Sequence, residues 1–433
     1  MGASARGVIA GVLIVTLAGC TSTSASSPSA AGASAPVWPA PTGGAASIPA
    51  TASPAGTLRA SLPAEPVWTR VADQAAFADA RIKAVAAGPN RYVAVGCSAR
   101  PRDIGTCDAL SWVSTDGVAW TRYAIPSASG ISLDHVLRGA GYLAWADFDA
   151  DAAAPFWASS DGVTWHRSAP VPGLADAMIT SVVWTGDRYL AAAGMPGQPF
   201  LLWVSSDGLT WRRHADAGCP APWVGMTTAE FVGPSLATVP ASVGGPDVRL
   251  LAWLKIAEGS AYRSFAGRAT DGRCWQWTEG APSIASVATV GPTLVALGAE
   301  IGQPGTLSGP PLAAWTSSDG LDWLPSRLPD RYPWQWFTGP VAADGVLVAL
   351  LQDTDRAFVW RSVDGFDWVE DSSGPDVAAE GRMPGMCADI PACPLRTGIA
   401  GLAWGPGGLI AVGSTGSGSG PSRAVVWTTQ PTD

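Results

Sequence analysis

One short turn recurs along this chain and limits what the chain can fold into. It is seen in "WASSDGVTWHR", from Trp157 to Arg167, where polar residues precede Asp-Gly and a tryptophan stands three positions after the glycine. Six copies occur, with 45 to 64 residues between successive aspartates, and a period of this length is typical of repeat architectures. The Asp, Gly and Trp of the copies are Asp116, Gly117 and Trp120; Asp161, Gly162 and Trp165; Asp207, Gly208 and Trp211; Asp271, Gly272 and Trp275; Asp319, Gly320 and Trp323; and Asp364, Gly365 and Trp368.

A second element, an alternating apolar strand that follows a turn, recurs seven times. Six units are therefore complete, and the seventh ends at "AVVWTTQ", residues 424–430, where its Asp-Gly turn would be expected. The missing outer strand matches "PVWTRVA", residues 66–72, near the other end of the chain. The seven recurring strands begin at Asn90, Ala140, Asp187, Pro234, Pro292, Gly345 and Gly407.

Six complete units and a seventh that is shared between the two ends of the chain predict an all-β fold. We expect a seven-bladed β-propeller of four-stranded blades over residues 62–433. An N-terminal strand would complete the last blade, and Trp68 and Trp427 would lie at this closure. Closure removes the unpaired apolar face that an open stack of blades would leave at each end. The 433 residues suffice for one such body, and we expect it to be a monomer.

The N-terminal segment predicts export and a lipid anchor. Residues 1–20 read "MGASARGVIAGVLIVTLAGC", with a basic Arg6 before an apolar run that is too short to span a bilayer of about 30 Å. The ending resembles a bacterial lipobox, which makes 1–19 a lipoprotein signal peptide and Cys20 the lipidated residue. Residues 20–61, rich in Ser, Ala, Pro and Thr, would form a disordered tether. We expect an extracytoplasmic protein that Cys20 anchors in the lipid bilayer; the alternative is an ordinary signal peptide with an accidental cysteine.

The recurring turn resembles the Asp box, or BNR repeat, of the sialidase-like propellers. It departs from that pattern because glycine directly follows the aspartate, as Gly162 follows Asp161, so the turn is one residue shorter. The resemblance implies structural turns that join the third and fourth strands of a blade, on the face opposite the active site. It also implies that a sialidase would carry an Arg-Ile-Pro motif, whereas this chain has Arg81-Ile82-Lys83.

Long loops would therefore gather on the face opposite the Asp-Gly turns, where propellers of this kind carry binding sites. One of them, "DRYPWQW", concentrates Arg331, Tyr332, Trp334 and Trp336, which are suited to stacking on a sugar ring or holding a protein partner. The alternative is an aromatic plug between two blades. These four residues are the candidate ligand face.

No cofactor is expected. The carboxylates Asp147, Asp149 and Asp151 alternate in "DFDAD" and leave calcium open as a ligand, but the loop lacks the glycine and distal glutamate of an EF-hand. A solvated acidic loop is the alternative interpretation. Nucleic acid is not expected as a partner, because a formal net charge of −9 opposes binding to a phosphate backbone.

The cysteine spacing predicts disulfides of an extracytoplasmic protein. Cys97 would pair with Cys107, and Cys387 with Cys393, each closing a short loop. After these two pairs and Cys20, Cys219 and Cys274 remain and could pair with each other. The propeller would place them near opposite faces, so the disulfide partner of each is left undecided. Only three histidines occur in the chain, which disfavours a zinc site.

Two classes of function fit these features. The first is a non-catalytic surface lipoprotein whose propeller is a binding or scaffold module for a glycan or protein partner. The second is a glycoside hydrolase of sialidase-like type acting on cell-surface or wall glycans, because sialidases share this scaffold. No motif assigns catalytic residues, so the sequence favours the binding module.

Overall fold

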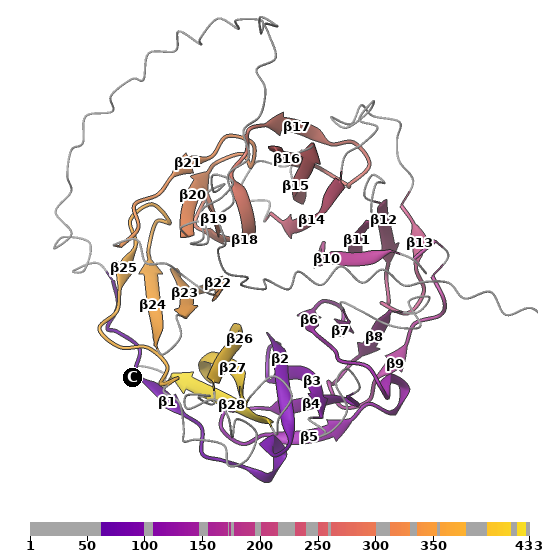
Figure 1. The fold of residues 1–433 in the computed structure, drawn as a ribbon, viewed down its shortest axis with the longest axis vertical. Helices are drawn as coiled ribbons and strands as arrows, with labels where there is room; N and C mark the ends of the chain where they lie inside the picture. Colours follow the sequence, from indigo (N-terminus) through magenta and orange to yellow (C-terminus); the bar gives the residue numbers. More distant parts are fainter. Residues whose placement is uncertain are drawn as a thin grey trace, which may run out of the picture. The chain divides into compact units, whose positions relative to one another are not determined.

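In the computed structural model, the described part of the chain forms a seven-bladed β-propeller (Figure 1). The chain divides into two compact units, Met1–Ala52 and Ser53–Asp433, and every described residue belongs to the second. None of these residues belongs to a helix long and apolar enough to cross a membrane. The described residues are 62–98, 107–146, 155–171, 173–174, 177–194, 201–214, 230–239, 250–258, 261–299, 312–329, 336–352, 356–377, 396–416 and 422–429.

Each blade is a four-stranded antiparallel sheet whose first strand lies nearest the centre of the ring. The strands, from the centre outward, are β2 (Ala80–Ala87), β3 (Tyr92–Ser98), β4 (Ala109–Ser114) and β5 (Thr121–Ala124) in blade 1; β6 (His135–Arg138), β7 (Tyr142–Trp145), β8 (Phe156–Ser159) and β9 (His166–Arg167) in blade 2; β10 (Met178–Trp184), β11 (Tyr189–Gly194), β12 (Leu201–Ser205) and β13 (Arg212–Arg213) in blade 3; β14 (Glu230–Thr238), β15 (Leu250–Glu258), β16 (Ala261–Ala269) and β17 (Gln276–Glu279) in blade 4; β18 (Ser283–Val290), β19 (Thr293–Ala299), β20 (Leu312–Ser317) and β21 (Leu324–Pro325) in blade 5; β22 (Trp336–Ala343), β23 (Val346–Gln352), β24 (Ala357–Ser362) and β25 (Val369–Glu370) in blade 6; and β26 (Arg396–Gly405), β27 (Gly408–Gly416), β28 (Ser422–Thr429) and β1 (Trp68–Arg70) in blade 7.

Two short 3-10 helices accompany these strands, η1 (Ala75–Phe77) and η2 (Pro126–Ala128). The sequence prediction of an all-β, seven-bladed propeller is therefore confirmed. Six of the seven recurring strands are the second strands of their blades, whereas the segment from Pro234 belongs to β14, the first strand of blade 4, in which β15 is the second. The sequence did not distinguish the two because both are apolar, and apolar runs do not reveal their place in a sheet.

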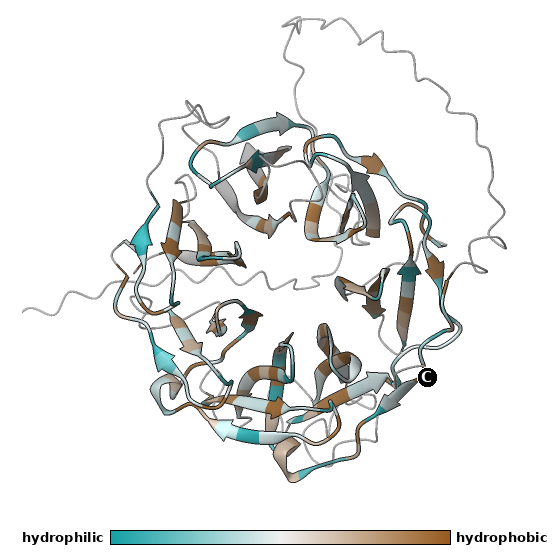
Figure 2. Ribbon diagram, turned by 180° about the vertical axis from the view of Figure 1, so that it is seen from behind, coloured by the Kyte–Doolittle hydropathy of each residue, from teal (hydrophilic) through white to brown (hydrophobic). Residues whose placement is uncertain are grey.

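The core is divided among the junctions between blades. The described residues form seven hydrophobic clusters, each of which joins two neighbouring blades around the ring. Figure 2 shows hydrophobic residues along the inner strands, whereas the short outermost strands β9 and β13 are hydrophilic. Each blade thus buries both faces of its inner strands against its neighbours, and no blade has a complete core of its own.

Tryptophans of the third strands occupy these junctions. Each stands two residues before the serine or threonine that ends its strand, and in blade 4 this position is Gly267, which the ring of Trp277 covers from β17. Five of the six indoles are at most 2% exposed, and Trp315 is half-buried. The six tryptophans are Trp112, Trp157, Trp203, Trp315, Trp360 and Trp427.

Ring closure uses both ends of the described chain. β1 pairs antiparallel with β28, with Trp68 opposite Thr429 and Arg70 opposite Trp427. The first strands of all seven neighbouring blade pairs contact each other, including β26 and β2, which belong to the last and first blades. The prediction that an N-terminal strand completes the last blade is confirmed.

A buried ion pair holds the residues that precede β1. Arg361, on β24 of blade 6, binds Asp371 with 2.7 Å between Nε and Oδ1, and both side chains are at most 6% exposed. The Arg361 guanidinium also donates hydrogen bonds to the carbonyl oxygens of Pro63 at 3.0 Å and Ala64 at 3.2 Å. The N-terminal segment is therefore fastened to blade 6 before it enters blade 7.

Replacing Trp68 by alanine should destabilise the propeller more than its position near the end of the described chain suggests. The half-buried indole packs on the apolar cluster between blades 6 and 7, so its loss should lower the free energy of unfolding by about 2–3 kcal/mol. Thermal unfolding followed by circular dichroism measures the effect. Val67→Ala, at a side chain that is 70% exposed, is the control; equal melting temperatures of the two variants would contradict the role of Trp68 in closure.

Candidate functional site

Five of the six Asp-Gly turns are held by hydrogen bonds in which a serine hydroxyl binds both the aspartate and the glycine N–H. In blade 2, Asp161 Oδ1 accepts bonds from the backbone N–H groups of Val163 at 2.8 Å and Thr164 at 3.0 Å. The Ser159 hydroxyl donates to the same oxygen at 3.0 Å and accepts from the N–H of Gly162 at 2.9 Å. The carboxylate therefore closes its own turn.

The same geometry returns in the other copies. In all six turns the indole N–H of the tryptophan donates to the glycine carbonyl oxygen, at 2.9 to 3.1 Å. The six glycines have φ between +76° and +80°, a region that side chains disfavour. The turn at Asp271 differs, because Ala269 stands in place of the serine.

In four of the turns these hydrogen bonds lower the pKa of the aspartate. Backbone N–H groups of Val118 and Ala119 lower the pKa of Asp116 below its ordinary value. Burial alone would raise the pKa of Asp161, but the bonds from Thr164, Val163 and Ser159 outweigh it and lower the pKa. The same balance lowers the pKa of Asp207 and Asp319.

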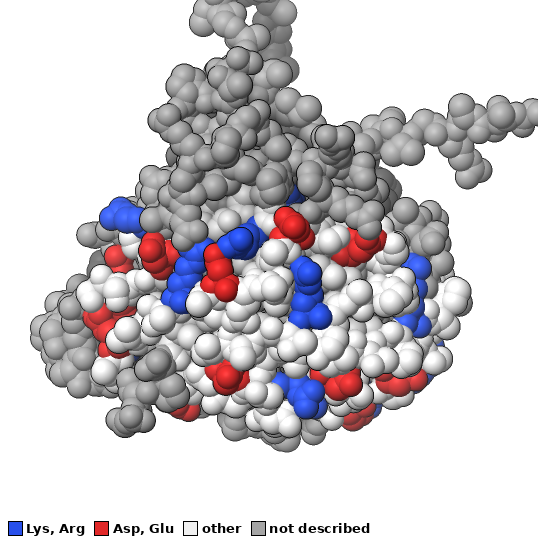
Figure 3. Space-filling model, turned by 90° about the horizontal axis from the view of Figure 1, so that it is seen from below, with Lys and Arg blue, Asp and Glu red and all other residues white. Residues whose placement is uncertain are grey.

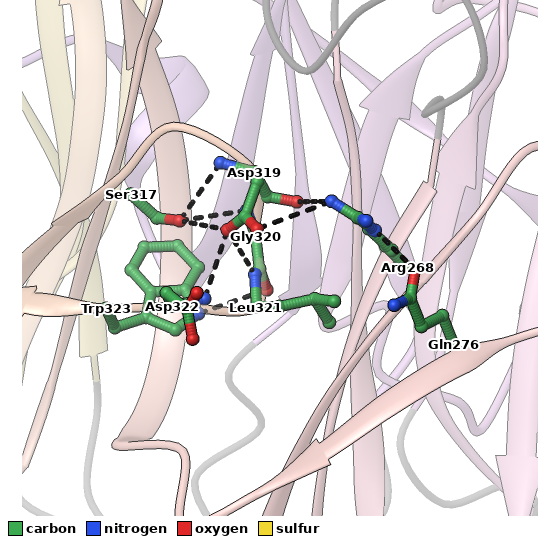
Figure 4. A network of polar contacts seen from close by, with 8 residues as sticks. All are labelled: Arg268, Gln276, Ser317, Asp319, Gly320, Leu321, Asp322 and Trp323. Carbon is green, nitrogen blue, oxygen red and sulfur yellow. Dashed lines mark hydrogen bonds and ion pairs between the residues drawn. The ribbon is translucent and has the colours of Figure 1, made fainter.

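Every turn is also docked on the preceding blade. Figure 4 shows Arg268 of β16 reaching the turn of blade 5, where its Nη1 lies 3.4 Å from both the carbonyl oxygen and Oδ2 of Asp319. Each of the other turns also has a carbonyl oxygen that is hydrogen-bonded by a residue preceding its own blade or belonging to the preceding blade. The pairs are Gln74 with Val118, Arg91 with Asp161, Ala169 with Leu209, His214 with Asp271 and Arg327 with Phe366.

The glycine of each turn fits against an apolar side chain of that preceding blade. A Cβ at Gly162 would collide with Val93, on β3 of blade 1. Only glycine therefore satisfies both the backbone conformation and the close approach. The side chains met in this way are Ile410, Val93, Leu143, Leu251 and Val295, for the turns of blades 1, 2, 3, 5 and 6 in order. In blade 4 a Cβ at Gly272 would lie 3.4 Å from Leu190 of blade 3 and 3.3 Å from Leu250 of its own blade.

Tyrosines strengthen three of the junctions on this face, which we call the Asp-Gly face. The Tyr92 hydroxyl donates to the Gly408 carbonyl oxygen at 2.7 Å and accepts from the Gly407 N–H at 2.8 Å, joining blade 1 to blade 7. The Tyr189 hydroxyl accepts from the Gly141 N–H at 3.3 Å, joining blade 3 to blade 2. Tyr142 lies against Gly88 between blades 2 and 1. Burial raises the pKa of all three phenols.

The sequence analysis missed these tyrosines. Their signal was present, since each begins the second strand of its blade and pairs with the serine that precedes an Asp-Gly turn: Tyr92 with Ser114, Tyr142 with Ser159, and Tyr189 with Ser205.

A pocket of about 540 Å³ opens on the Asp-Gly face between blades 3 and 4. Leu190 and Leu250, each 1% exposed, supply its apolar surface. Its polar surface comes from the turn of residues 185–188 in blade 3 and from Thr270 and Asp271 in blade 4.

Ion pairs and a buried histidine surround this pocket. The Arg188 guanidinium binds Asp187 Oδ2 through Nε at 3.0 Å and Nη2 at 2.6 Å, and the Thr185 hydroxyl donates to the other carboxylate oxygen at 2.8 Å. These bonds lower the pKa of Asp187. Arg273 lies 3.7 Å from Asp271. Burial lowers the pKa of His214, whose Nε2 lies 2.9 Å from the Asp271 carbonyl oxygen.

The opposite face, where the long loops were expected, is described in part. A pocket of about 280 Å³ lies there on blade 6, lined by residues 356–358 and 370–377. Trp336 begins β22, whereas Arg331, Tyr332 and Trp334 lie outside the described residues, as do Asp147, Asp149 and Asp151. The candidate ligand face therefore remains a prediction. Within the described ranges, no group of three or more His, Cys, Asp or Glu residues is placed to hold a metal ion.

The cysteines are also described in part. A disulfide joins Cys97 to Cys107, as the spacing predicted. Cys274 is disulfide-bonded as well, and its partner lies outside the described residues. Cys20, Cys219, Cys387 and Cys393 lie outside them too.

Charged groups of both signs are distributed over the surface. On the side of the propeller that Figure 3 shows, acidic and basic side chains lie interspersed among uncharged ones. Several form exposed pairs, such as Arg263 with Glu279 and Lys83 with Asp134. Exposed pairs of this kind contribute little to stability, typically below about 1 kcal/mol.

Comparison with known proteins gives structural neighbours only. No protein-family model matches the chain, and no curated protein matches it. Among solved structures, Trypanosoma rangeli sialidase in complex with sialic acid is similar at 13% identity and a TM-score of 0.44; the alignment covers 84% of this chain and 59% of the sialidase chain, so this chain spans less than two thirds of that length.

Other structural neighbours are β-propeller domains of proteins that are not named as sialidases. The β-propeller domain of Myceliophteria thermophila Cps50 (Swd1) is similar at 11% identity and a TM-score of 0.47, covering 84% of this chain and 99% of that one. The β-propeller domain of the Trilobed protease from Pyrococcus furiosus is similar at 10% identity and a TM-score of 0.43, covering 82% and 98%. The neighbours thus include sialidases and other propellers.

Two glycines with matched backbone angles test how the turns dock. Gly162→Ala places a methyl group against Val93 at φ +78°, whereas Gly130→Ala places one in open space at φ +79°. The first should lower the free energy of unfolding by about 2–4 kcal/mol and the second by about 1–2 kcal/mol. Thermal or denaturant unfolding compares the two, and equal losses would show that packing on the preceding blade does not matter.

Proposed function

We propose that this protein is a membrane-anchored extracytoplasmic lipoprotein whose propeller is a non-catalytic binding or scaffold module for a glycan or protein partner. The Asp-Gly turns would be the Asp boxes of this module. In that role they stabilise the ring, and the ligand is held by other surfaces.

The structural use of the carboxyl groups in the Asp-Gly turns, where they bind backbone N–H groups and serine hydroxyls, is the observation that carries the binding role. Glycoside hydrolysis requires a general acid, a carboxyl group whose pKa is raised so that it keeps its proton near neutral pH. Among the described residues, every carboxyl group with a shifted pKa has it lowered: Asp116, Asp161, Asp187, Asp207, Glu279 and Asp319. Such groups are suited to hydrogen bonding and ion pairing.

Two features support a location outside the cytoplasm. The sequence Leu17-Ala18-Gly19-Cys20 has the small residues and the cysteine that lipoprotein processing requires. The disulfide between Cys97 and Cys107, and the disulfide-bonded Cys274, are typical of oxidising compartments. A lipid on Cys20 would also provide the anchor, since each buried CH₂ contributes about 0.8 kcal/mol.

Lipidation is tested with the full chain in a bacterial host that processes lipoproteins, fed with an alkyne-labelled fatty acid. We expect label on the wild-type protein and its recovery in the membrane fraction. Cys20→Ala should lose the label, whereas Thr21→Ala, which keeps the cysteine, should retain it. Label that persists in Cys20→Ala would rule out the anchor.

Binding without turnover is tested with the detergent-solubilised full chain. Fluorogenic glycosides, sialosides included, should be released no faster than in buffer. Glycan arrays and cross-linking on intact cells should reveal a retained ligand. Release of fluorophore that scales with protein concentration and disappears when one carboxylate is replaced by its amide would establish a hydrolase and overturn the binding role.

A further inference from the structure

Although charges of both signs mix over the surface as a whole, the outermost strands separate them. Each outermost strand begins at or directly after a tryptophan, which is Trp68 in blade 7 and the tryptophan of the Asp-Gly turn in the other blades. From the residue before this tryptophan to the end of the strand, blades 7, 1, 2 and 3 carry basic side chains and no carboxylate, whereas blades 4, 5 and 6 carry carboxylates and no basic side chain. The basic residues are Arg70, Arg122, His166, Arg167, Arg212 and Arg213, and the acidic residues are Glu279, Asp322, Asp367 and Glu370.

The second residue after this tryptophan lies opposite the third-strand position that a tryptophan fills in six blades. In blade 2 the Arg167 guanidinium lies 5.0 Å from the centre of the Trp157 ring, so the side chain covers the indole. The pairs are Arg70 with Trp427, Arg122 with Trp112, Arg167 with Trp157, Arg213 with Trp203, Trp277 with Gly267, Pro325 with Trp315 and Glu370 with Trp360.

Covering this position does not require a positive charge. Pro325 and Glu370 take the same place in blades 5 and 6. Packing on the indole explains the apolar stem of each arginine, but it does not explain why four blades in succession around the ring use a cation. Like charges gathered on one side of a molecule attract a ligand of the opposite sign.

The basic side chains are densest on blades 2 and 3. There the outermost strands β9 and β13 consist wholly of basic residues, His166, Arg167, Arg212 and Arg213, which we call the basic edge. The side chains of His166, Arg212 and Arg213 are exposed, and none of these three forms an ion pair with another described residue. The aspartates of the turns before β9 and β13 accept hydrogen bonds from their own turns. The basic edge therefore presents cations that are available to a ligand.

We propose that the basic edge binds an acidic polysaccharide, a chain that carries a carboxylate or sulfate group on each repeat. This inference rests on the proposed binding role and names the class of glycan for it. Arginine suits such groups because its planar guanidinium can donate two parallel hydrogen bonds to one oxyanion. Arg122 and Arg70 continue the row into blades 1 and 7, so cations recur at equivalent positions from blade to blade. A polymer whose charges also recur can engage several of them at once.

The shape of the ring favours a flexible chain over a flat partner. The outermost strands lie on the outside of the ring and turn away from one another from blade to blade (Figure 1). A flat bilayer would contact only part of this arc, whereas a polymer can follow it from blade 7 to blade 3. The carboxylates of blades 4 to 6 would repel the same chain, which limits binding to the basic side of the ring.

The test is binding of the full chain in detergent to immobilised polygalacturonate and dextran sulfate, measured by biolayer interferometry, with dextran as the uncharged control. We expect saturable binding to at least one acidic polymer and none to dextran, and comparison of the two acidic polymers separates carboxylate from sulfate as the preferred group. Affinity should fall as salt is raised, because salt screens exposed charges. Binding to dextran as strong as to the acidic polymers, or no binding to either acidic polymer, would overturn the inference.

Paired variants locate the binding on the basic edge. Arg212→Gln with Arg213→Gln should weaken binding at least about tenfold, whereas Arg212→Lys with Arg213→Lys keeps the charge and should retain most of the affinity. Arg263→Gln with Arg327→Gln is the control: it removes the same charge from ion pairs on the acidic side of the ring and should leave affinity within about twofold. Melting temperatures check that each variant is folded. Equal losses in the two glutamine variants would show that only net charge matters and would refute the site.

Two further ligands identify other occupants. Tighter binding of a single-stranded oligonucleotide, or of vesicles of anionic lipid by the Cys20→Ala chain, would assign the basic edge to a phosphate polymer or to the membrane and would contradict the glycan. Failure here is distinguishable from failure of the proposed function. A chain that is lipidated and retains a neutral glycan or a protein partner, yet does not bind acidic polysaccharides, would contradict this inference alone.

Discussion

The pairing of β1 with β28 is the interaction on which the rest of the structure depends. Each blade buries its inner strands against two neighbours, so every junction requires a blade on both sides. An open array would leave two apolar sheet faces in water. Pairing the first described strand with the last closes the ring, and Arg361 fastens the chain just before this strand.

The Asp-Gly turns hold neighbouring blades together through packing and hydrogen bonds. Inside each turn the aspartate satisfies backbone N–H groups, which would otherwise be unpaired at a tight bend. Outside it, the glycine lies against an apolar side chain of the preceding blade, and polar groups of that blade reach the turn. The repeated turn therefore serves the ring as much as its own blade, which explains why six copies recur in nearly the same form.

Blade 4 departs from the repeat in several ways at one place. It replaces the serine of the turn by Ala269 and the third-strand tryptophan by Gly267. Trp277 compensates for one of these changes by covering Gly267 from the neighbouring strand. A pocket lies beside this turn, between blades 3 and 4. Positions where a sequence breaks its own local rule are where function is expected, and Ala269 directly precedes two residues that line the pocket, Thr270 and Asp271.

The sequence by itself determined the number of blades, the strands within most of them and the closure at Trp68. These follow from a local repeat, in which residues a few positions apart meet in one turn or one strand. It did not reveal that the strand at Pro234 is a first rather than a second strand, since both kinds of strand are apolar. The short spacing of the cysteines also predicted the disulfide between Cys97 and Cys107. Only the tertiary structure decided which glycine faces Val93, which turn Arg268 reaches, and where a pocket opens between blades 3 and 4. Those contacts join different blades, and their geometry depends on how neighbouring sheets pack around the closed ring.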